Sequence, residues 1–279
     1  MNTREVKQIV KGMRSSDGDG VQLTRVIGTP YLDMLDPFLL LDAFGSDKPQ
    51  DYIGGFPSHP HRGFETVTYM LAGKMRHKDS AGNEGVVEAG GIQWMTAGKG
   101  IIHSEMPEQE EGLLAGFQLW VNLPAKDKMT APKYQERTAA EIPQEVRDDG
   151  TRISVIAGQT SQGTNGVIEN DNISPTYWDV HLSAGSKLDE AITDNHTAFI
   201  YAIEGQIKVG DDEKLLESGH LAVLDTTGRV KVTSDKDSRF LLIGGKPLKE
   251  SIARHGPFVM NTKQEIYQAF EDYQSGRLA

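Results

Sequence analysis

The sequence contains no cysteine among its 279 residues. Disulfide bonds and thiol catalysis are therefore excluded, and a closed structural zinc site, which usually contains cysteine, is disfavoured. Long apolar runs are also missing, since no stretch of about 18 apolar residues occurs. The first residues, Met1-Asn-Thr-Arg-Glu-Val-Lys7, lack the apolar core of a secretory signal. We therefore expect a cytoplasmic protein without membrane contact.

Positive charge is scarce. The chain has 29 lysines and arginines against 40 aspartates and glutamates, a formal net charge of -11 and a pI near 5.2. A surface that neutralises nucleic-acid phosphates needs an excess of basic side chains. Direct binding to nucleic acid is therefore not expected.

What the chain does contain is a pair of short polar patterns, His59-Pro60-His61 and His103-Ser104-Glu105. The first precedes a run rich in β-branched and aromatic residues, and the second follows the turn-like residues 96–100. In an extended chain, residues two apart project from the same face. Two such strands side by side would bring three imidazoles and one carboxylate to one point.

This set of side chains indicates a reactive metal site. Imidazole nitrogen and carboxylate oxygen suit Fe, Mn, Ni, Cu or Zn, and the residue types do not select among them. An ion that prefers six ligands would keep two positions open for substrate, water or dioxygen. Open positions indicate chemistry rather than a structural role for the metal.

At these residues the chain resembles the pirin family of the cupin superfamily. The resemblance covers nearly the whole chain and is carried by segments that begin at His59, Gln93, His103, Gln118, Pro132 and Gly256. It implies that the metal ligands are His59, His61, His103 and Glu105. Glu65 matches a metal ligand of many other cupins, but pirin-like proteins do not use this glutamate as a ligand. We therefore expect Glu65 to lie behind the ligands or inside the barrel.

The resemblance also implies the architecture: an all-β fold of two tandem cupin barrels of the jelly-roll type (a bicupin) with a C-terminal α-helix. The expected domains are residues 1–130, with the metal site, and residues 131–279, without one. An internal repeat supports two barrels, because residues 198–205 and 217–224 resemble residues 66–73 and 89–96.

The repeat allows the ligand positions to be compared between the two halves. His59 and His61 fall on Ala191 and Thr193, whereas His103 and Glu105 fall on Lys231 and Thr233. The second barrel is therefore predicted to lack a comparable site.

Three further expectations concern single elements. Thr262 and Glu265 form a capping-box pattern at the start of a helix whose apolar face contains Ile266, Phe270 and Tyr273. His77 is expected to be a solvated strand residue rather than a ligand. Trp120 is expected in the core rather than as a platform for substrate.

Two functions follow from the resemblance. The first is a metal-dependent dioxygenase similar to quercetin 2,3-dioxygenase, which cleaves a flavonol with dioxygen and in which Glu105 is both ligand and catalytic base. Fe(II) is the expected metal, with Zn, Mn, Ni, Co or Cu as alternatives. The second is a metal-dependent, redox-sensitive regulator that binds a transcription factor or another enzyme. The expected partners are thus a small aromatic substrate and dioxygen, or a protein, and the chain is expected to be a monomer.

Overall fold

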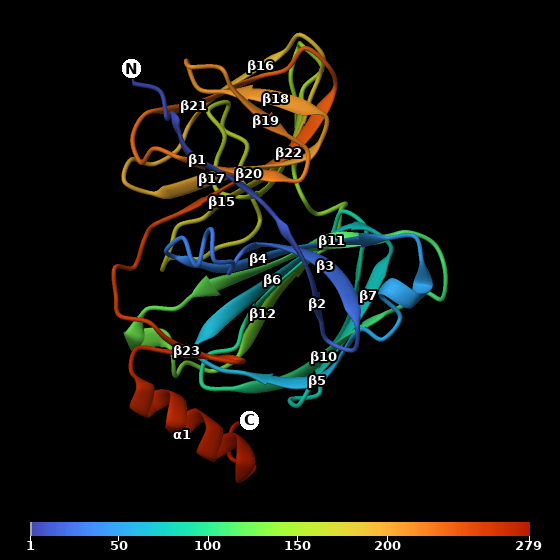
Figure 1. Cartoon of the computed structure of the whole chain (residues 1–279), viewed down its shortest axis with the longest axis vertical. Helices are drawn as coiled ribbons and strands as arrows, with labels where there is room; N and C mark the ends of the chain where they lie inside the picture. The colour runs from blue at the N-terminus through green and yellow to red at the C-terminus, as the bar shows by residue number, and fades with distance from the viewer. Residues whose placement is uncertain (1) are drawn as a thin grey trace. The chain divides into compact units, whose positions relative to one another are not determined.

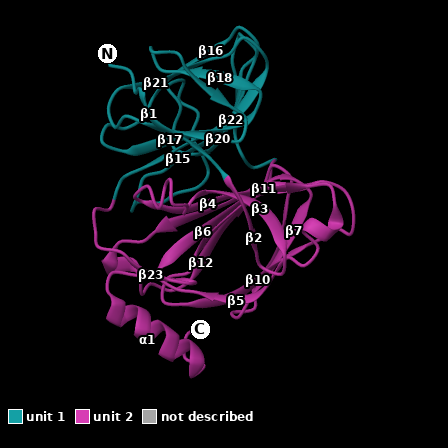
Figure 2. Ribbon diagram, viewed as in Figure 1, with its two compact units in different colours: residues 1–12, 140–247 teal, residues 13–139, 248–279 magenta. Residues whose placement is uncertain are grey.

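The computed structural model describes residues 2–279, which are mostly antiparallel strands with one α-helix. Their contacts divide the chain into two compact units (Figure 2). Unit 1 contains residues 1–12 and 140–247, and unit 2 contains residues 13–139 and 248–279. Each unit has one seven-stranded and one four-stranded antiparallel sheet. The expected all-β fold of two cupin barrels with a terminal helix is confirmed.

The larger sheet of unit 2 has the strand order β12-β9-β6-β11-β4-β3-β2. Its strands are β2 (Met13–Asp17), β3 (Val21–Ile27), β4 (Phe38–Ser46), β6 (Phe64–Ala72), β9 (Ile92–Thr96), β11 (Leu114–Asn122) and β12 (Lys133–Arg137). The smaller sheet has the order β5-β10-β7-β8. Its strands are β5 (Phe56–His61), β7 (Lys74–Asp79), β8 (Glu84–Glu88) and β10 (Ile101–Pro107). Unit 2 also contains a hairpin of β23 (Ala253–His255) and β24 (Phe258–Met260). Its loops include two short 3-10 helices, Pro49–Asp51 and Ala125–Asp127.

Unit 1 repeats this arrangement. Its larger sheet has the order β1-β20-β17-β22-β15-β14-β13 and its smaller sheet the order β16-β21-β18-β19. The strands of the larger sheet are β1 (Val6–Lys11), β13 (Gln144–Val146), β14 (Arg152–Ala157), β15 (Thr176–Leu182), β17 (Thr197–Glu204), β20 (His220–Leu224) and β22 (Ser238–Gly245). Those of the smaller sheet are β16 (Lys187–Ala191), β18 (Gln206–Val209), β19 (Lys214–Glu217) and β21 (Arg229–Thr233).

The two units are not separated by a single cut between residues 130 and 131. At the edge of the larger sheet of unit 1, β1 pairs with β20, although β1 comes from the start of the chain. The corresponding edge strand of unit 2 is β12, which pairs with β9. Residues 248–279 belong to unit 2 rather than to the second barrel. Each unit thus takes in a segment from a distant part of the chain.

Strands β6 and β11 show how the sequence creates a polar interior beside an apolar core. Both are central in the larger sheet of unit 2, and almost all of β6 is buried. On β11, Phe117, Leu119 and Val121 are buried on one face, whereas Gln118 and Trp120 alternate onto the other. The face that carries Gln118 and Trp120 is the one that lines the pocket described below.

The terminal helix α1 (Lys263–Gln274) begins as predicted. The Thr262 hydroxyl accepts a hydrogen bond from the Glu265 backbone, and the Glu265 side chain accepts one from the Thr262 backbone. Figure 1 shows the helix beside β23, and Ile266 and Ala269 pack with Phe258 of β24. Tyr273 is 40% exposed, so the apolar face is narrower than the pattern predicted. Among residues 2–279, no helix has the length and apolarity required to cross a membrane.

Candidate metal centre

The two polar patterns lie on neighbouring antiparallel strands, β5 and β10, which Figure 1 shows side by side. His59 pairs with His103, and His61 pairs with Ile101. The register then shifts between His103 and Glu105, so that Glu105 lies opposite Phe56. The expected arrangement of two adjacent extended segments is present, and it brings the side chains of both patterns to the same face.

Three imidazole rings converge at this place. The Nε2 atoms of His59 and His61 are 3.0 Å apart. The ring centroid of His103 lies 4.4 Å from that of His59 and 5.0 Å from that of His61. One ring nitrogen from each residue lies within 4.8 Å of the other two, and together these nitrogens can hold a metal ion.

The ring nitrogens of this group suit a cation. Both nitrogens of His103 are buried and lack a hydrogen-bond partner within residues 2–279, a costly arrangement for a polar group. Burial, with a smaller effect of the neighbouring histidines, lowers the pKa of His61 well below its usual value and that of His103 to about 3. These imidazoles are therefore neutral at physiological pH and present lone pairs. A bound metal would satisfy one of the two His103 nitrogens that lack a partner.

Glu105 lies near the histidines without belonging to the group of three mutually close nitrogens. Its side chain is buried, with 5% exposure, and lines the same pocket as His59 and His61. Oε1 accepts a hydrogen bond of 2.8 Å from the Thr68 hydroxyl, and Oε2 accepts one of 3.3 Å from the Gln118 amide. The Thr68 hydroxyl also lies 2.7 Å from Gln118 Oε1. Both carboxylate oxygens are thus oriented by side chains from β6 and β11.

The histidines open onto a pocket of about 600 Å³. Its wall is mainly aromatic and aliphatic, with Phe44, Phe56 and Trp120 as the large rings. The ring of Trp120 lies 5.3 Å from that of His61 and 4.3 Å from that of Phe64. Trp120 therefore packs against the buried residue Phe64, as predicted for a core residue, but β11 also turns its side chain towards the pocket, which was not predicted. A planar aromatic ligand is a suitable occupant of such a pocket.

Two other polar residues were predicted near the motif. Glu65 is 3% exposed and accepts a hydrogen bond of 2.7 Å from the Thr96 hydroxyl, as expected of a residue inside the barrel. His77 was predicted to be solvated, but it is 6% exposed and its Nε2 lies 2.7 Å from a carboxylate oxygen of Glu136. That prediction is wrong because β7 lies between β10 and β8 and Tyr134 stacks on the imidazole ring.

The turn that follows β5 is held by a buried lysine. Lys128 is 1% exposed, and its Nζ donates to Gly63 O at 2.7 Å, Asn122 Oδ1 at 2.7 Å and Val259 O at 3.0 Å. Burial lowers the pKa of Lys128 to about 8. The lysine thus connects the turn after β5 to the C-terminal segment, a contact that no local pattern indicated.

The strand register of unit 1 corrects one comparison between the barrels. Asp189 pairs with Lys231, and Ala191 pairs with Arg229. His59 and His61 therefore correspond to Asp189 and Ala191, and the assignment to Ala191 and Thr193 is wrong. The connection before β17 contains residues 192–196, whereas the one before β6 contains only residues 62 and 63. Asp189 and Lys231 form ion pairs instead: Asp189 Oδ1 lies 2.5 Å from Arg229 Nε, and Lys231 Nζ lies 2.7 Å from Asp211 Oδ1.

Known proteins agree with this architecture. A family model described as Pirin matches residues 20–121, and one described as Pirin C-terminal cupin domain matches residues 177–279. A pirin-like protein of Caulobacter vibrioides is 52% identical, covering 99% of this chain and 100% of that protein. A Pseudomonas aeruginosa protein provisionally named quercetin 2,3-dioxygenase is 47% identical, covering 99% and 98%.

Among solved structures, a quercetin 2,3-dioxygenase from Acinetobacter baumannii superposes with a TM-score of 0.91 at 35% identity, covering 99% of each chain. The two family models together match more than half of the chain, and the relatives span its length. The chain therefore belongs to the pirin family and contains its two cupin domains.

Proposed function

We propose that this protein is a metal-dependent dioxygenase that cleaves a small aromatic substrate of the flavonol type with dioxygen. The observation that carries the proposal is the convergence of three imidazoles beside a buried carboxylate, at the side of a pocket with aromatic walls. The likeness to proteins named quercetin 2,3-dioxygenase supports the reaction class.

His59, His61 and His103 would hold the metal, with Glu105 as a fourth ligand. The fit rests on the orphaned nitrogens of His103 and on the close approach of His59 and His61. We propose Fe(II) as the ion, since nitrogen and oxygen ligands with open positions are typical of non-haem iron oxygenases. When bound, the metal would supply the open positions at which substrate and dioxygen meet.

In this proposal Glu105 also takes the proton of the substrate hydroxyl. A carboxylate that accepts two hydrogen bonds, from Thr68 and Gln118, has fixed oxygens and lone pairs left over for a third donor. Because Glu105 lines the pocket, the hydroxyl of a bound substrate would be able to reach it. Trp120 and Phe56 would hold the aromatic ring in place from the pocket wall.

The test measures metal, oxygen and substrate on the same samples. Protein purified without chelator is analysed for metals, and protein reloaded separately with Fe(II), Mn, Ni, Co, Cu or Zn is assayed for aerobic loss of quercetin and uptake of dioxygen. We expect turnover that scales with bound metal and stops without oxygen. A fully loaded protein with no turnover of any flavonol would refute the proposal and favour the regulatory binding function.

A further inference from the structure

The pocket of the metal centre contains two guanidinium groups with different surroundings. Arg25 lies 2.7 Å from a carboxylate oxygen of Asp42 and 3.0 Å from one of Asp17. Arg254, on β23, forms no ion pair with any residue in the range 2–279. Its charge is therefore available to a ligand, whereas that of Arg25 is already neutralised.

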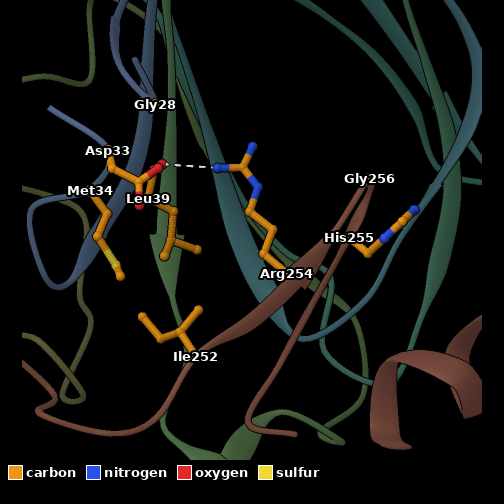
Figure 3. Close-up of a pocket in the computed structure, with 8 residues that line it drawn as sticks. All are labelled: Gly28, Asp33, Met34, Leu39, Ile252, Arg254, His255 and Gly256. Carbon is orange, nitrogen blue, oxygen red and sulfur yellow. Dashed lines mark hydrogen bonds between the residues drawn. The ribbon is translucent and has the colours of Figure 1, made fainter. Parts of the chain in front are cut away.

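The position of Arg254 is defined by two contacts. Nη1 donates a hydrogen bond of 3.1 Å to the Leu39 carbonyl oxygen, drawn as a dashed line in Figure 3. The guanidinium carbon lies 4.7 Å from the ring centroid of Trp120, a cation–π contact. Stacking occupies the face of the guanidinium, and one hydrogen bond occupies part of its edge. Several N–H donors therefore remain free.

The electrostatic surroundings leave the positive charge of Arg254 incompletely compensated. Burial lowers the pKa of Arg254 below its usual value, and the nearby Arg25 adds to this effect. Asp33, Asp42 and Asp17 act in the opposite direction without cancelling it. An anionic group on a ligand would supply the missing compensation.

The charges that line the pocket also favour an anionic ligand. Three carboxylates, those of Asp17, Asp42 and Glu105, face two guanidinium groups, those of Arg25 and Arg254. The lining therefore carries one net negative charge, which a divalent ion at the histidines would turn into one net positive charge. With metal bound, the pocket is complementary to a monoanion.

We propose that Arg254 binds an anionic oxygen of the substrate, so that the pocket selects planar aromatic compounds that carry a carboxylate or phenolate. This inference rests on the proposed function, because it names the substrate class of that site. Trp120 contacts both Arg254 and His61, so the aromatic ring of the substrate would lie along this indole between the anchor and the metal ligands. Arg254 is thus a specificity-determining residue that comes from the C-terminal segment.

The test compares two probes of the same shape, 2-naphthoate and the neutral 2-naphthamide, by isothermal titration calorimetry. The proteins are the parent, Arg254→Met, Arg254→Lys and the control Arg14→Met, all with measured and equal metal content. Arg14 is an exposed residue of β2 that does not line this pocket, so its change removes the same charge elsewhere. Methionine at 254 retains an apolar stem and loses the charge.

We expect Arg254→Met to weaken 2-naphthoate binding about tenfold to a hundredfold, the range for a charge-assisted hydrogen bond. Binding of 2-naphthamide should change less than about threefold, and Arg254→Lys should be intermediate for the anion. Arg14→Met should match the parent. An equal loss for both probes, an unchanged affinity for the anion, or no binding of 2-naphthoate by the parent would each overturn the proposal.

The result is separable from that of the turnover assay. Charge-selective binding that depends on Arg254, in a protein without flavonol turnover, would support the anchor and reject the dioxygenase. Flavonol turnover with an unchanged KM in Arg254→Met, together with equal binding of the two probes, would support the dioxygenase and reject the anchor.

Discussion

The substitution Glu105→Gln tests the role of the carboxylate with little disturbance of its surroundings. In the parent, Oε1 accepts from Thr68 and Oε2 accepts from Gln118. A glutamine can place its oxygen towards the Gln118 amide and its nitrogen towards the Thr68 hydroxyl. That hydroxyl then donates to Gln118 Oε1, which is already 2.7 Å away. The hydrogen bonds are retained, whereas the negative charge and the capacity to accept a proton are lost.

The expected loss of turnover per bound metal is large. General-base catalysis typically contributes about a hundredfold to ten-thousandfold, which corresponds to about 3 to 5 kcal/mol of transition-state stabilisation. The assay is single-turnover loss of quercetin under saturating oxygen, with metal content measured on the same sample, because an amide is a weaker ligand than a carboxylate.

A matched variant separates the effect of losing the base from the effect of losing its orientation. Thr68→Val removes one donor to Glu105 and leaves the carboxylate in place, so its turnover should fall only on the order of tenfold. Equal turnover per bound metal in Glu105→Gln and the parent would remove Glu105 from the role of base. A loss no larger than that of Thr68→Val would contradict the magnitude argued above.

Three other predictions concern the metal and the fold. His61→Ala should lower metal content by about tenfold or more by elemental analysis, because it removes one of the three converging nitrogens; a content near that of the parent would show that the ligand assignment is wrong. Removal of metal by chelator should leave the β-type circular dichroism intact, because each unit buries its own apolar clusters; cooperative unfolding at room temperature would contradict this. Lys128→Met should destabilise the protein by about 3 kcal/mol in urea at pH 7, because it leaves three buried acceptors without a donor.

Lys128 also predicts a dependence of stability on pH. Its pKa is about 8 in the folded protein and about 10.4 in the unfolded chain, so the unfolded state binds more protons between these values. The free energy of unfolding of the parent, relative to that of Lys128→Met, should therefore rise between about pH 8 and 10 and remain flat below pH 8. A difference between the two proteins that is independent of pH up to 10 would show that Lys128 keeps its ordinary pKa. Equilibrium urea unfolding at several pH values measures it.

The sequence by itself determined the location of the site and the class of fold. The period of two in a strand projects His59 and His61 from one face of their strand, and likewise His103 and Glu105 from one face of theirs, so local spacing alone indicates two strands that each present a pair of candidate ligands. The capping pattern at Thr262 likewise depends only on residues within one turn of helix.

Tertiary structure decided everything that depends on pairing between distant segments. The residue of the second barrel that is equivalent to His59 changed by two positions, from Ala191 to Asp189, because a longer connection before β17 alters the count without altering the hydrophobic pattern. The alternation along β11 places Trp120 on one of two faces, and only the closed barrel shows that this face meets the pocket. Arg254 contacts Trp120, which is more than a hundred residues away in the sequence. Lys128 donates hydrogen bonds to three separate segments of the chain. No local pattern specifies such contacts, because they arise when separate strands bury their apolar faces together.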